Sequence, residues 1–413
     1  MASTSGRVAF GMVVVSLGLA VFTALRPDPG GPPLEKVRPA PPPATGAPSD
    51  SALERQVRAL MMAQQYGRAR GVLQDALRRE PRDHEARLLY AELLLQERNL
   101  DECVVELNML AESGFRPAAV HRTLGRAWSF RGDLRRAVSH FERCLALDER
   151  DALCRRWLAD ACLDLGNAGQ AVREYEKALS YAPGDAQIFK SLGLAYRTMN
   201  RLDEAVAAYR EAVSLAPRDP AANNDLARIL AVQGRMDEAV AQLDRAIAVL
   251  PNEQVLRAVL RPAPGEVYGD IGCGSGRFTF VLAKWVGPRG KVYAIDVDPL
   301  PLKLVDGYIR RRGVRNVEIV RSKPREIGIP DGSLDRALII NVYNHVAEAG
   351  EATTRAWIAS VVRTVKPGGK ILVIDSALSR AMPVAHLKAH GFRLEREEPL
   401  REGGYVLLFT RSG

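Results

Sequence analysis

The sequence predicts a multidomain chain: an N-terminal transmembrane helix, a solenoid of stacked repeats, and an α/β domain with a parallel sheet. Three observations support this fold class. Residues 8–25 carry no charge, residues 51–253 repeat with a period of 34, and residues 267–296 hold a glycine-rich turn between two apolar stretches. A chain of 413 residues with 47% apolar content is long enough for two or three domains.

The first 25 residues form the predicted membrane anchor. Val8 to Leu25 would make a helix of about 27 Å, close to the thickness of a bilayer core. A cleaved signal peptide needs small side chains before its cleavage site, and Phe22 occupies such a position. We therefore predict an uncleaved single-pass anchor over residues 1–25, with the other domains in the cytoplasm. The alternative is an export signal.

Residues 26–50 form the predicted linker. They contain nine prolines with interspersed glycine and alanine, a composition that cannot build a core and favours an extended spacer.

Residues 51–253 repeat three positions every 34 residues. The first series is Ala69, Cys103, Ala137, Ala171, Ala205 and Ala239; the second is Leu73, Leu107, Phe141, Tyr175, Tyr209 and Leu243; the third is Ala76, Leu110, Cys144, Ala178, Ala212 and Ala246. The pattern resembles the tetratricopeptide repeat. The resemblance implies six units of two antiparallel helices, hence an all-α solenoid with a concave surface that binds protein partners.

The same resemblance implies that fixed positions of each first helix line the concave surface. In this chain they hold Arg122, Arg126, Arg156, Lys190 and Arg228, against Glu54, Glu92 and Asp160. We hypothesise that this groove binds an acidic segment or chain terminus of a partner protein. The alternative is that the arginines pair within the array or only solvate its surface.

The α/β domain is predicted over residues 254–413. Val267 to Gly276 runs from a short apolar strand into three alternate glycines, and a helical segment, Arg277–Val286, follows. Glycine allows a sharp turn and a close ligand, and the helix start directs free N–H groups at that ligand. A second strand, Lys291–Asp296, ends in a carboxylate, which in a doubly wound sheet lies where ribose hydroxyls need acceptors.

Four further features continue this order of motifs. They are Asp270 before the first glycine, Pro330–Asp335 before the strand 336–340, Val365–Lys370 before the strand 371–375, and a closing strand pair at 392–397 and 405–410. Together they resemble the class I S-adenosylmethionine-dependent methyltransferases, which implies a Rossmann-like fold and S-adenosylmethionine as cofactor. By this resemblance Asp270, Gly272, Gly274 and Gly276 hold the methionine part, and Asp296 holds the ribose.

The acceptor side is predicted at Ile340–His345. This stretch resembles a loop of methyltransferases similar to quinone-biosynthesis enzymes. The resemblance implies that His345 acts as a general base while Tyr343 and Asn341 shape the pocket. The alternative for His345 is a structural hydrogen bond at a strand end.

Lys323 departs from the family pattern, because many relatives carry an acid near the adenine at this place. This departure favours a domain that does not catalyse.

The sequence leaves two candidate functions for the whole chain. The first is a membrane-anchored methyltransferase whose array recruits a partner or substrate. The second is an interaction scaffold with a non-catalytic methyltransferase-like domain.

The formal net charge of +9 lies almost entirely in residues 254–413, with a cluster at Arg310–Arg312 and Arg315. Such a cluster attracts nucleic acid, anionic lipid or acidic protein. Aromatic residues do not interleave with it, so contact with lipid headgroups is predicted rather than nucleic-acid binding. The five cysteines form no Cys-x-x-Cys pair, which predicts buried, reduced thiols and no metal site.

Overall fold

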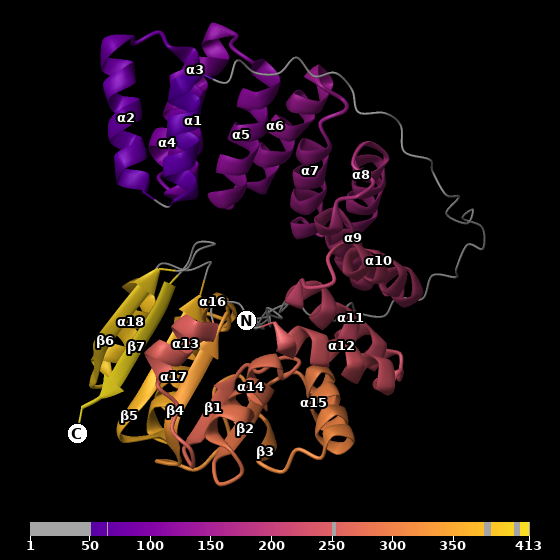
Figure 1. Ribbon diagram of the computed structural model, residues 1–413, viewed down its shortest axis with the longest axis vertical. Coiled ribbons are helices and arrows are strands. Elements are labelled where there is room, and N and C mark those ends of the chain that lie inside the picture. Colours follow the sequence, from indigo (N-terminus) through magenta and orange to yellow (C-terminus); the bar gives the residue numbers. More distant parts are fainter. Residues whose placement is uncertain (1–50, 64, 250–252, 376–380, 400–404, 413) are drawn as a thin grey trace, which may run out of the picture. The chain divides into compact units, whose positions relative to one another are not determined.

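The computed structural model describes residues 51–63, 65–249, 253–375, 381–399 and 405–412 (Figure 1). These residues form two compact units that divide between Leu215 and Ala216. The division falls inside the 34-residue repeat pattern. One unit contains helices only, and the other contains the last two repeat helices together with the sheet.

The helical unit consists of α1 (Ala52–Met62), α2 (Tyr66–Arg79), α3 (His84–Gln96), α4 (Leu100–Ser113), α5 (Pro117–Phe130), α6 (Leu134–Leu147), α7 (Ala152–Asp164), α8 (Ala168–Tyr181), α9 (Ala186–Thr198) and α10 (Leu202–Leu215). Each helix packs against the next, as the two-helix repeat predicts. The described part of the chain thus contains the predicted helical solenoid.

Small side chains at the repeated positions let the helices of a pair approach closely. The first repeated series, from Ala69 to Ala239, is fully buried at every position. A Cβ at Gly193 would lie 2.9 Å from the ring of Tyr209, so α9 and α10 approach each other where one residue has no side chain. The absence of a side chain at Gly193 makes room for the Tyr209 ring, as the dense packing of protein interiors requires.

Aspartates begin the first helices of several repeats. Asp83 accepts a hydrogen bond from Ala86 N over 2.9 Å, and Asp151 accepts one from Cys154 N over 2.8 Å. Asp185 accepts from two amides in the same way. Each side chain satisfies an N–H group that the helix leaves unpaired, which explains why the helices begin at fixed places in the period.

The second unit begins with two repeat helices and continues into the sheet. Its helices are α11 (Pro220–Val232), α12 (Met236–Ala248), α13 (Glu253–Leu260), α14 (Arg277–Val286), α15 (Pro299–Arg312), α16 (Tyr343–Glu348), α17 (Glu351–Thr364) and α18 (Ala381–Ala389). Its strands are β1 (Val267–Ile271), β2 (Lys291–Asp296), β3 (Val317–Arg321), β4 (Leu334–Ile340), β5 (Val365–Asp375), β6 (Phe392–Pro399) and β7 (Tyr405–Arg411).

The sheet has the order β3-β2-β1-β4-β5-β7-β6, in which β7 is antiparallel to both of its neighbours. Every strand expected from the sequence is present, including the closing pair. One face is covered by α16, α17 and α18, and the opposite face by α13 and α14. The order reverses between β1 and β4, and in such sheets ligands bind at the carboxyl ends of the strands beside the reversal.

The predicted membrane anchor needs a correction. In the part of the chain that the structure describes, no helix is both long enough and apolar enough to cross a bilayer. The longest of these helices have 14 residues, about 21 Å, against a hydrocarbon core of about 30 Å. The prediction of a single-pass, membrane-anchored protein is therefore wrong for the described chain. Residues 1–25 and the linker 26–50 lie outside the described residues.

All five cysteines lie in described residues, and all are free and buried. Burial raises the pKa of the Cys103 thiol to about 12. The expectation of buried cysteines without disulfides is confirmed for all five.

Candidate active site

The predicted cofactor loop joins β1 to α14 at the carboxyl edge of the sheet. The N–H groups of Gly272 and Cys273 both donate to the Ile295 carbonyl, over 2.7 and 2.9 Å, which ties the loop to the end of β2. Gly272 has a φ of +73°, and a Cβ there would lie 2.2 Å from Val342 Cγ2. Glycine is therefore required here for the backbone conformation and for the close approach of the segment after β4.

The other two glycines differ in their surroundings. A Cβ at Gly276 would lie 2.9 Å from both Phe280 and Val305, so this glycine serves packing. A Cβ at Gly274 would meet no atom within 4 Å. The backbone of Gly274 is thus the part of the loop that a ligand can approach directly.

Asp296 lies at the end of β2 and is bonded to this loop. Its Oδ2 atom accepts from Gly274 N over 2.8 Å, and its Oδ1 atom accepts from Asp298 N over 2.9 Å. Burial raises the pKa of Asp296, while these amides act in the opposite direction. A carboxylate oxygen has more than one lone pair, so each oxygen can accept a further hydrogen bond, as a pair of ribose hydroxyls requires.

Asp270, at the other side of the loop, is buried. Thr279 Oγ1 donates to its Oδ2 atom over 2.5 Å, which joins β1 to the first turn of α14. Burial raises the pKa of Asp270 to about 6, and the nearby charge of Asp296 acts in the same direction. Two carboxylates that disfavour each other's charge make this loop a favourable place for a positive group.

These features fit S-adenosylmethionine. Its ribose needs two acceptors, its amino and sulfonium groups are positive, and its methionine part needs backbone without a Cβ in the way. Asp296, Asp270 and Gly274 offer these properties in turn. The predicted cofactor residues thus surround one loop at one edge of the sheet.

On the acceptor side, Tyr343 is fully buried in α16. Its hydroxyl forms a hydrogen bond with His386 Nδ1, and its ring packs edge-on against Trp357 with centroids 6.1 Å apart. Burial raises the pKa of the Tyr343 hydroxyl. This tyrosine therefore stays neutral and belongs to the core beneath the sheet edge.

Asn341 and His345 lie on either side of Tyr343. Asn341 is exposed and has a φ of +53°, a strained conformation for a residue with a side chain, and its N–H donates to Ile374 O over 2.8 Å. The His345 side chain is 37% exposed, with Nδ1 3.9 Å from Glu348 Oε2. The Tyr343 hydroxyl therefore contacts His386, whereas His345 lies beside Glu348.

His386 on α18 is the residue that sequence reasoning missed. Its Nδ1 atom contacts Tyr343, and its Nε2 atom lies 3.5 Å from Glu351 Oε1, which gives a Tyr–His–Glu chain across three helices. Tyr405, at the start of β7, has a buried hydroxyl with no hydrogen-bond partner in the described chain. Its pKa is raised to about 12 by burial and by Asp375. No spacing in the sequence points to either residue.

Lys323, the departure from the family pattern, lies beyond the end of β3. Its side chain is 82% exposed, with Nζ 3.9 Å from Glu326 Oε2, and the two residues also exchange backbone hydrogen bonds. The Lys323 ammonium group is therefore solvated and does not point toward the carboxyl edge of the sheet.

The arginines of the predicted groove are largely paired. Arg122 contacts Asp151 over 2.8 Å, and Arg156 lies 3.8 Å from Asp185. Arg126 differs, because it makes no ion pair with any described residue. Its guanidinium lies over the Trp157 ring, 4.3 Å from the centroid, within the helical unit. Burial lowers the pKa of Arg126, and neighbouring arginines add to this.

The basic cluster at the end of α15 is also paired. Arg310 lies 2.9 Å from Asp306, while Arg311 and Arg312 form ion pairs with Asp237 and Asp244 of α12. These three side chains are engaged within their own unit, so lipid contact is not needed to explain them.

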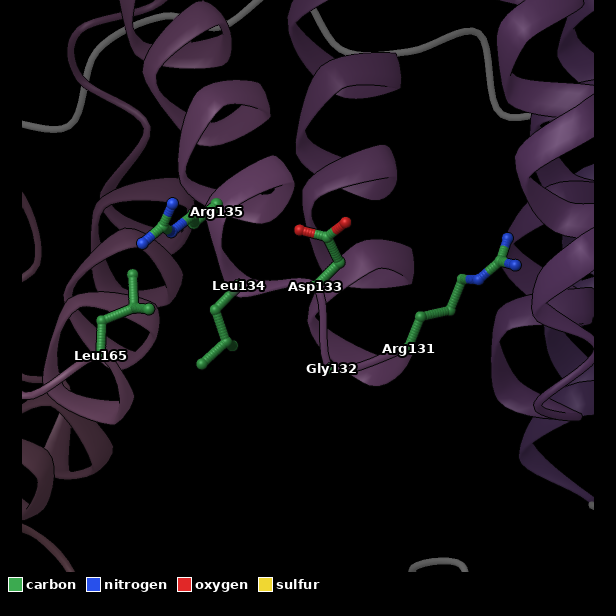
Figure 2. A pocket seen from close by; sticks show the side chains of 6 residues that line it. All are labelled: Arg131, Gly132, Asp133, Leu134, Arg135 and Leu165. Carbon is green, nitrogen blue, oxygen red and sulfur yellow. The ribbon is translucent and has the colours of Figure 1, made fainter. Parts of the chain in front are cut away.

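Two hollows lie away from the loop. The first, of about 450 Å³, is lined by Arg131, Gly132, Asp133, Leu134, Arg135 and Leu165. Figure 2 shows that Arg131 and Arg135 point in different directions and do not converge on one point. Asp133 accepts from Arg136 N over 3.0 Å, and Arg131 pairs with Asp101 over 2.9 Å. This hollow therefore offers no set of converging polar groups.

The second hollow, of about 510 Å³, includes Lys291 and Val317, the first residues of β2 and β3. It lies at the amino edge of the sheet, opposite the glycine loop. Ligands of doubly wound sheets bind at the other edge.

Comparison with known proteins gives family matches for both the helical repeats and the α/β domain. Residues 269–369 match the family model of a methyltransferase domain, and residues 60–127, 131–193 and 190–253 match models of the tetratricopeptide repeat. Over 108 residues the chain is 29% identical to a demethylmenaquinone methyltransferase of Geobacillus stearothermophilus, covering 26% of this chain and 44% of that protein.

Over 107 residues the chain is 32% identical to a ubiquinone/menaquinone biosynthesis C-methyltransferase of Pseudomonas putida, covering 26% of this chain and 40% of that one. The chain thus spans less than half the length of the curated relatives it matches. A solved structure of a SAM dependent methyltransferase from Aquifex aeolicus matches 41% of this chain and 97% of its own, with 21% identity and a TM-score of 0.36.

Proposed function

We propose that this chain, which carries tetratricopeptide repeats and a methyltransferase domain, is an active S-adenosylmethionine-dependent methyltransferase whose array recruits a protein partner or substrate. The observation that carries the proposal is the hydrogen bond from Gly274 to Asp296. It joins the glycine loop to the acid at the end of β2, at the edge of the sheet where such folds bind ligands.

Within this proposal the cofactor residues have separate roles. Asp296 accepts from the ribose hydroxyls, while Asp270 and the loop from Gly272 to Gly276 hold the methionine part. Bound S-adenosylmethionine supplies a methyl group on a sulfonium, which is already an activated electrophile. The protein therefore mainly aligns donor and acceptor and excludes water.

For the acceptor we propose a hydroxylated ring of the quinone type. The matched relatives are named for demethylmenaquinone and for ubiquinone/menaquinone biosynthesis, and the latter for C-methylation. A ring carbon becomes a better nucleophile when the neighbouring ring hydroxyl loses its proton, so such a site needs a base.

The hydrogen-bonded series Tyr343–His386–Glu351 provides groups that can accept that proton. A neutral imidazole at His386 can take a proton through the Tyr343 hydroxyl, and Glu351 stabilises the imidazolium that results. Tyr343 passes the proton without keeping a charge, because burial raises its pKa. His345 is the alternative candidate for the base. Asn341 lies just after β4, at the start of the segment that contains both His345 and Tyr343.

The scaffold alternative has weaker support. Its main argument was a lysine where an adenine-binding acid is expected, and the Lys323 side chain is largely exposed. A solvated lysine does not repel an adenine held by backbone groups.

For the array we propose an acidic segment as the bound part of the partner. Tetratricopeptide arrays bind proteins through their concave surface. Arg126 supports the acidic choice, since it has no ion pair among the described residues and is held by aromatic rings of α5 and α7, Phe130 and Trp157. An arriving carboxylate would meet a guanidinium that is already oriented.

The test is a calorimetric titration of S-adenosylmethionine into the full-length chain, beside an Asp296→Ala variant. We expect micromolar binding, weakened about 100-fold in the variant, because two hydrogen bonds to a charged group are lost. A folded wild-type chain that binds nothing at millimolar cofactor would contradict the proposal.

A further inference from the structure

We propose that the sixth repeat, formed by α11 and α12, contributes to the cofactor site, and that Asn224 on α11 positions the glycine loop through Ser275. The inference rests on the methyltransferase function proposed above. It assigns to a repeat helix a role in cofactor binding that differs from partner recruitment.

The direct contact is a hydrogen bond in which Ser275 Oγ donates to Asn224 Oδ1. Ser275 is buried, and it lies between Gly274, whose N–H is bonded to Asp296, and Gly276, whose N–H donates to Cys273 O over 3.0 Å. The side chain of Ser275 is thus held by α11, while the backbone on either side of it forms the loop.

A second set of contacts joins the same repeat to α15. Tyr308 donates to Asp244 Oδ1 over 2.7 Å, and Arg312 Nε donates to Asp244 Oδ2 over 3.0 Å. A Cβ at Gly307 would lie 2.4 Å from Met236 Sδ, so α15 and α12 approach each other where α15 carries no side chain. The pairing is therefore close-packed as well as polar.

These contacts also lead back to the loop. The ring of Tyr308 stacks on Phe280 with centroids 4.0 Å apart, and a Cβ at Gly276 would lie 2.9 Å from the Phe280 ring. The loop is supported at Ser275 by α11 directly. At Gly276 the loop is supported by the stacked rings of Phe280 and Tyr308, and the Tyr308 hydroxyl is hydrogen-bonded to Asp244 of α12.

Electrostatic interactions also link the sixth repeat to the start of α14. Arg277 is the first residue of α14, where a cation is unfavourable because the N-terminal end of a helix is itself positive. Burial lowers the pKa of Arg277, while Asp219 and Asp225 of the sixth repeat raise it. Two acids of the repeat thus favour the positive charge at the start of the helix that follows the loop.

Two variants of the full-length chain test the positioning role: Asn224→Ala and Ser275→Ala, with their double variant. We expect each to weaken S-adenosylmethionine binding about fivefold, as the loss of one hydrogen bond predicts, and the double variant to be no weaker than either single one. Asn224→Asp keeps an acceptor oxygen and should bind more tightly than Asn224→Ala.

The matched control is Asp237→Asn, which removes the exposed ion pair with Arg311 in the same interface. It should leave cofactor affinity within twofold of wild type. Hydrogen exchange of the Gly274 and Gly276 amides, measured without cofactor, should be several-fold faster in Asn224→Ala and unchanged in the control.

The outcomes separate the inference from the proposed function. Wild-type affinity and wild-type loop exchange in a folded Asn224→Ala variant would overturn the positioning role. A wild-type chain that binds no cofactor would contradict the proposed function and the cofactor role of the repeat together. Exchange of the loop amides would then still decide whether Asn224 holds the loop.

Discussion

The backbone N–H of Gly274 and the Oδ2 atom of Asp296 are joined by a hydrogen bond of 2.8 Å across 22 residues of sequence. The loop after β1 and the acid at the end of β2 are thereby one hydrogen-bonded unit. A ligand that contacts the acid also meets the loop in a defined position.

The first prediction concerns the glycines of this loop. Gly272→Ala should destabilise the fold by about 2–4 kcal/mol, because its Cβ would lie 2.2 Å from Val342 Cγ2 on a backbone with positive φ. Chemical denaturation measures this loss. The double variant with Val342→Ala should recover part of it, and no recovery would show that the backbone strain alone is responsible.

Gly274→Ala is expected to behave differently. The space beside Gly274 is open, so the cost is the positive φ alone, about 1–2 kcal/mol. Cofactor binding should fall by more than tenfold, because the new methyl group occupies the approach to the backbone. Calorimetry and denaturation on the same preparations compare the two effects. A variant with wild-type affinity would count against ligand contact at this position.

A third prediction is a pH dependence from Asp270. Burial raises its pKa from 3.8 to about 6, so between these values the folded chain binds a proton that the unfolded chain releases. The resulting stabilisation is complete below about pH 4 and lost above about pH 6, and it amounts to about 3 kcal/mol. The free energy of unfolding of wild type, minus that of Asp270→Asn, should therefore fall as pH rises over this range. A flat difference would mean that Asp270 titrates normally.

A fourth prediction separates the two candidate bases. With a demethylmenaquinol analogue as acceptor, His386→Gln should lower kcat about 100-fold with unchanged cofactor affinity, as expected for loss of a general base. His345→Gln should change kcat by less than about threefold, because its side chain is partly exposed and paired only at 3.9 Å with Glu348. The reverse order of effects would assign the base to His345. Thermal unfolding of both variants controls for loss of fold.

The last prediction concerns the groove of the array. Arg126→Glu should weaken binding of a glutamate-rich peptide at least tenfold, measured by fluorescence anisotropy, and the wild-type affinity should fall with added salt. Arg135→Glu makes the same charge change at an exposed position of α6 and serves as control. Equal binding by all three proteins would exclude Arg126 as an anchor.

Several features of the fold could be predicted because they depend on residues close in sequence. The 34-residue period places small residues such as Ala171 and Ala205 at buried helix contacts, and the structure buries both completely. The run from Asp270 to Gly276 predicts a strand, a turn and a helix, since φ preferences and apolar alternation are local properties. The predicted anchor depended on residues 8–25 alone. Among the described helices, none is long and apolar enough to cross a membrane.

The sequence by itself determined the two kinds of domain, the order of the strands along the chain, and the glycine loop with Asp296 at the end of the next strand. Tertiary structure alone decided which distant side chains meet. Tyr343 and His386 are 43 residues apart, and Ser275 and Asn224 are 51 apart. Such pairs form only when helices pack on a sheet face or on each other, and neither spacing nor periodicity records that packing. The same reason explains why the arginines of α15, which as a sequence resemble a free basic cluster, form ion pairs with the aspartates of α12.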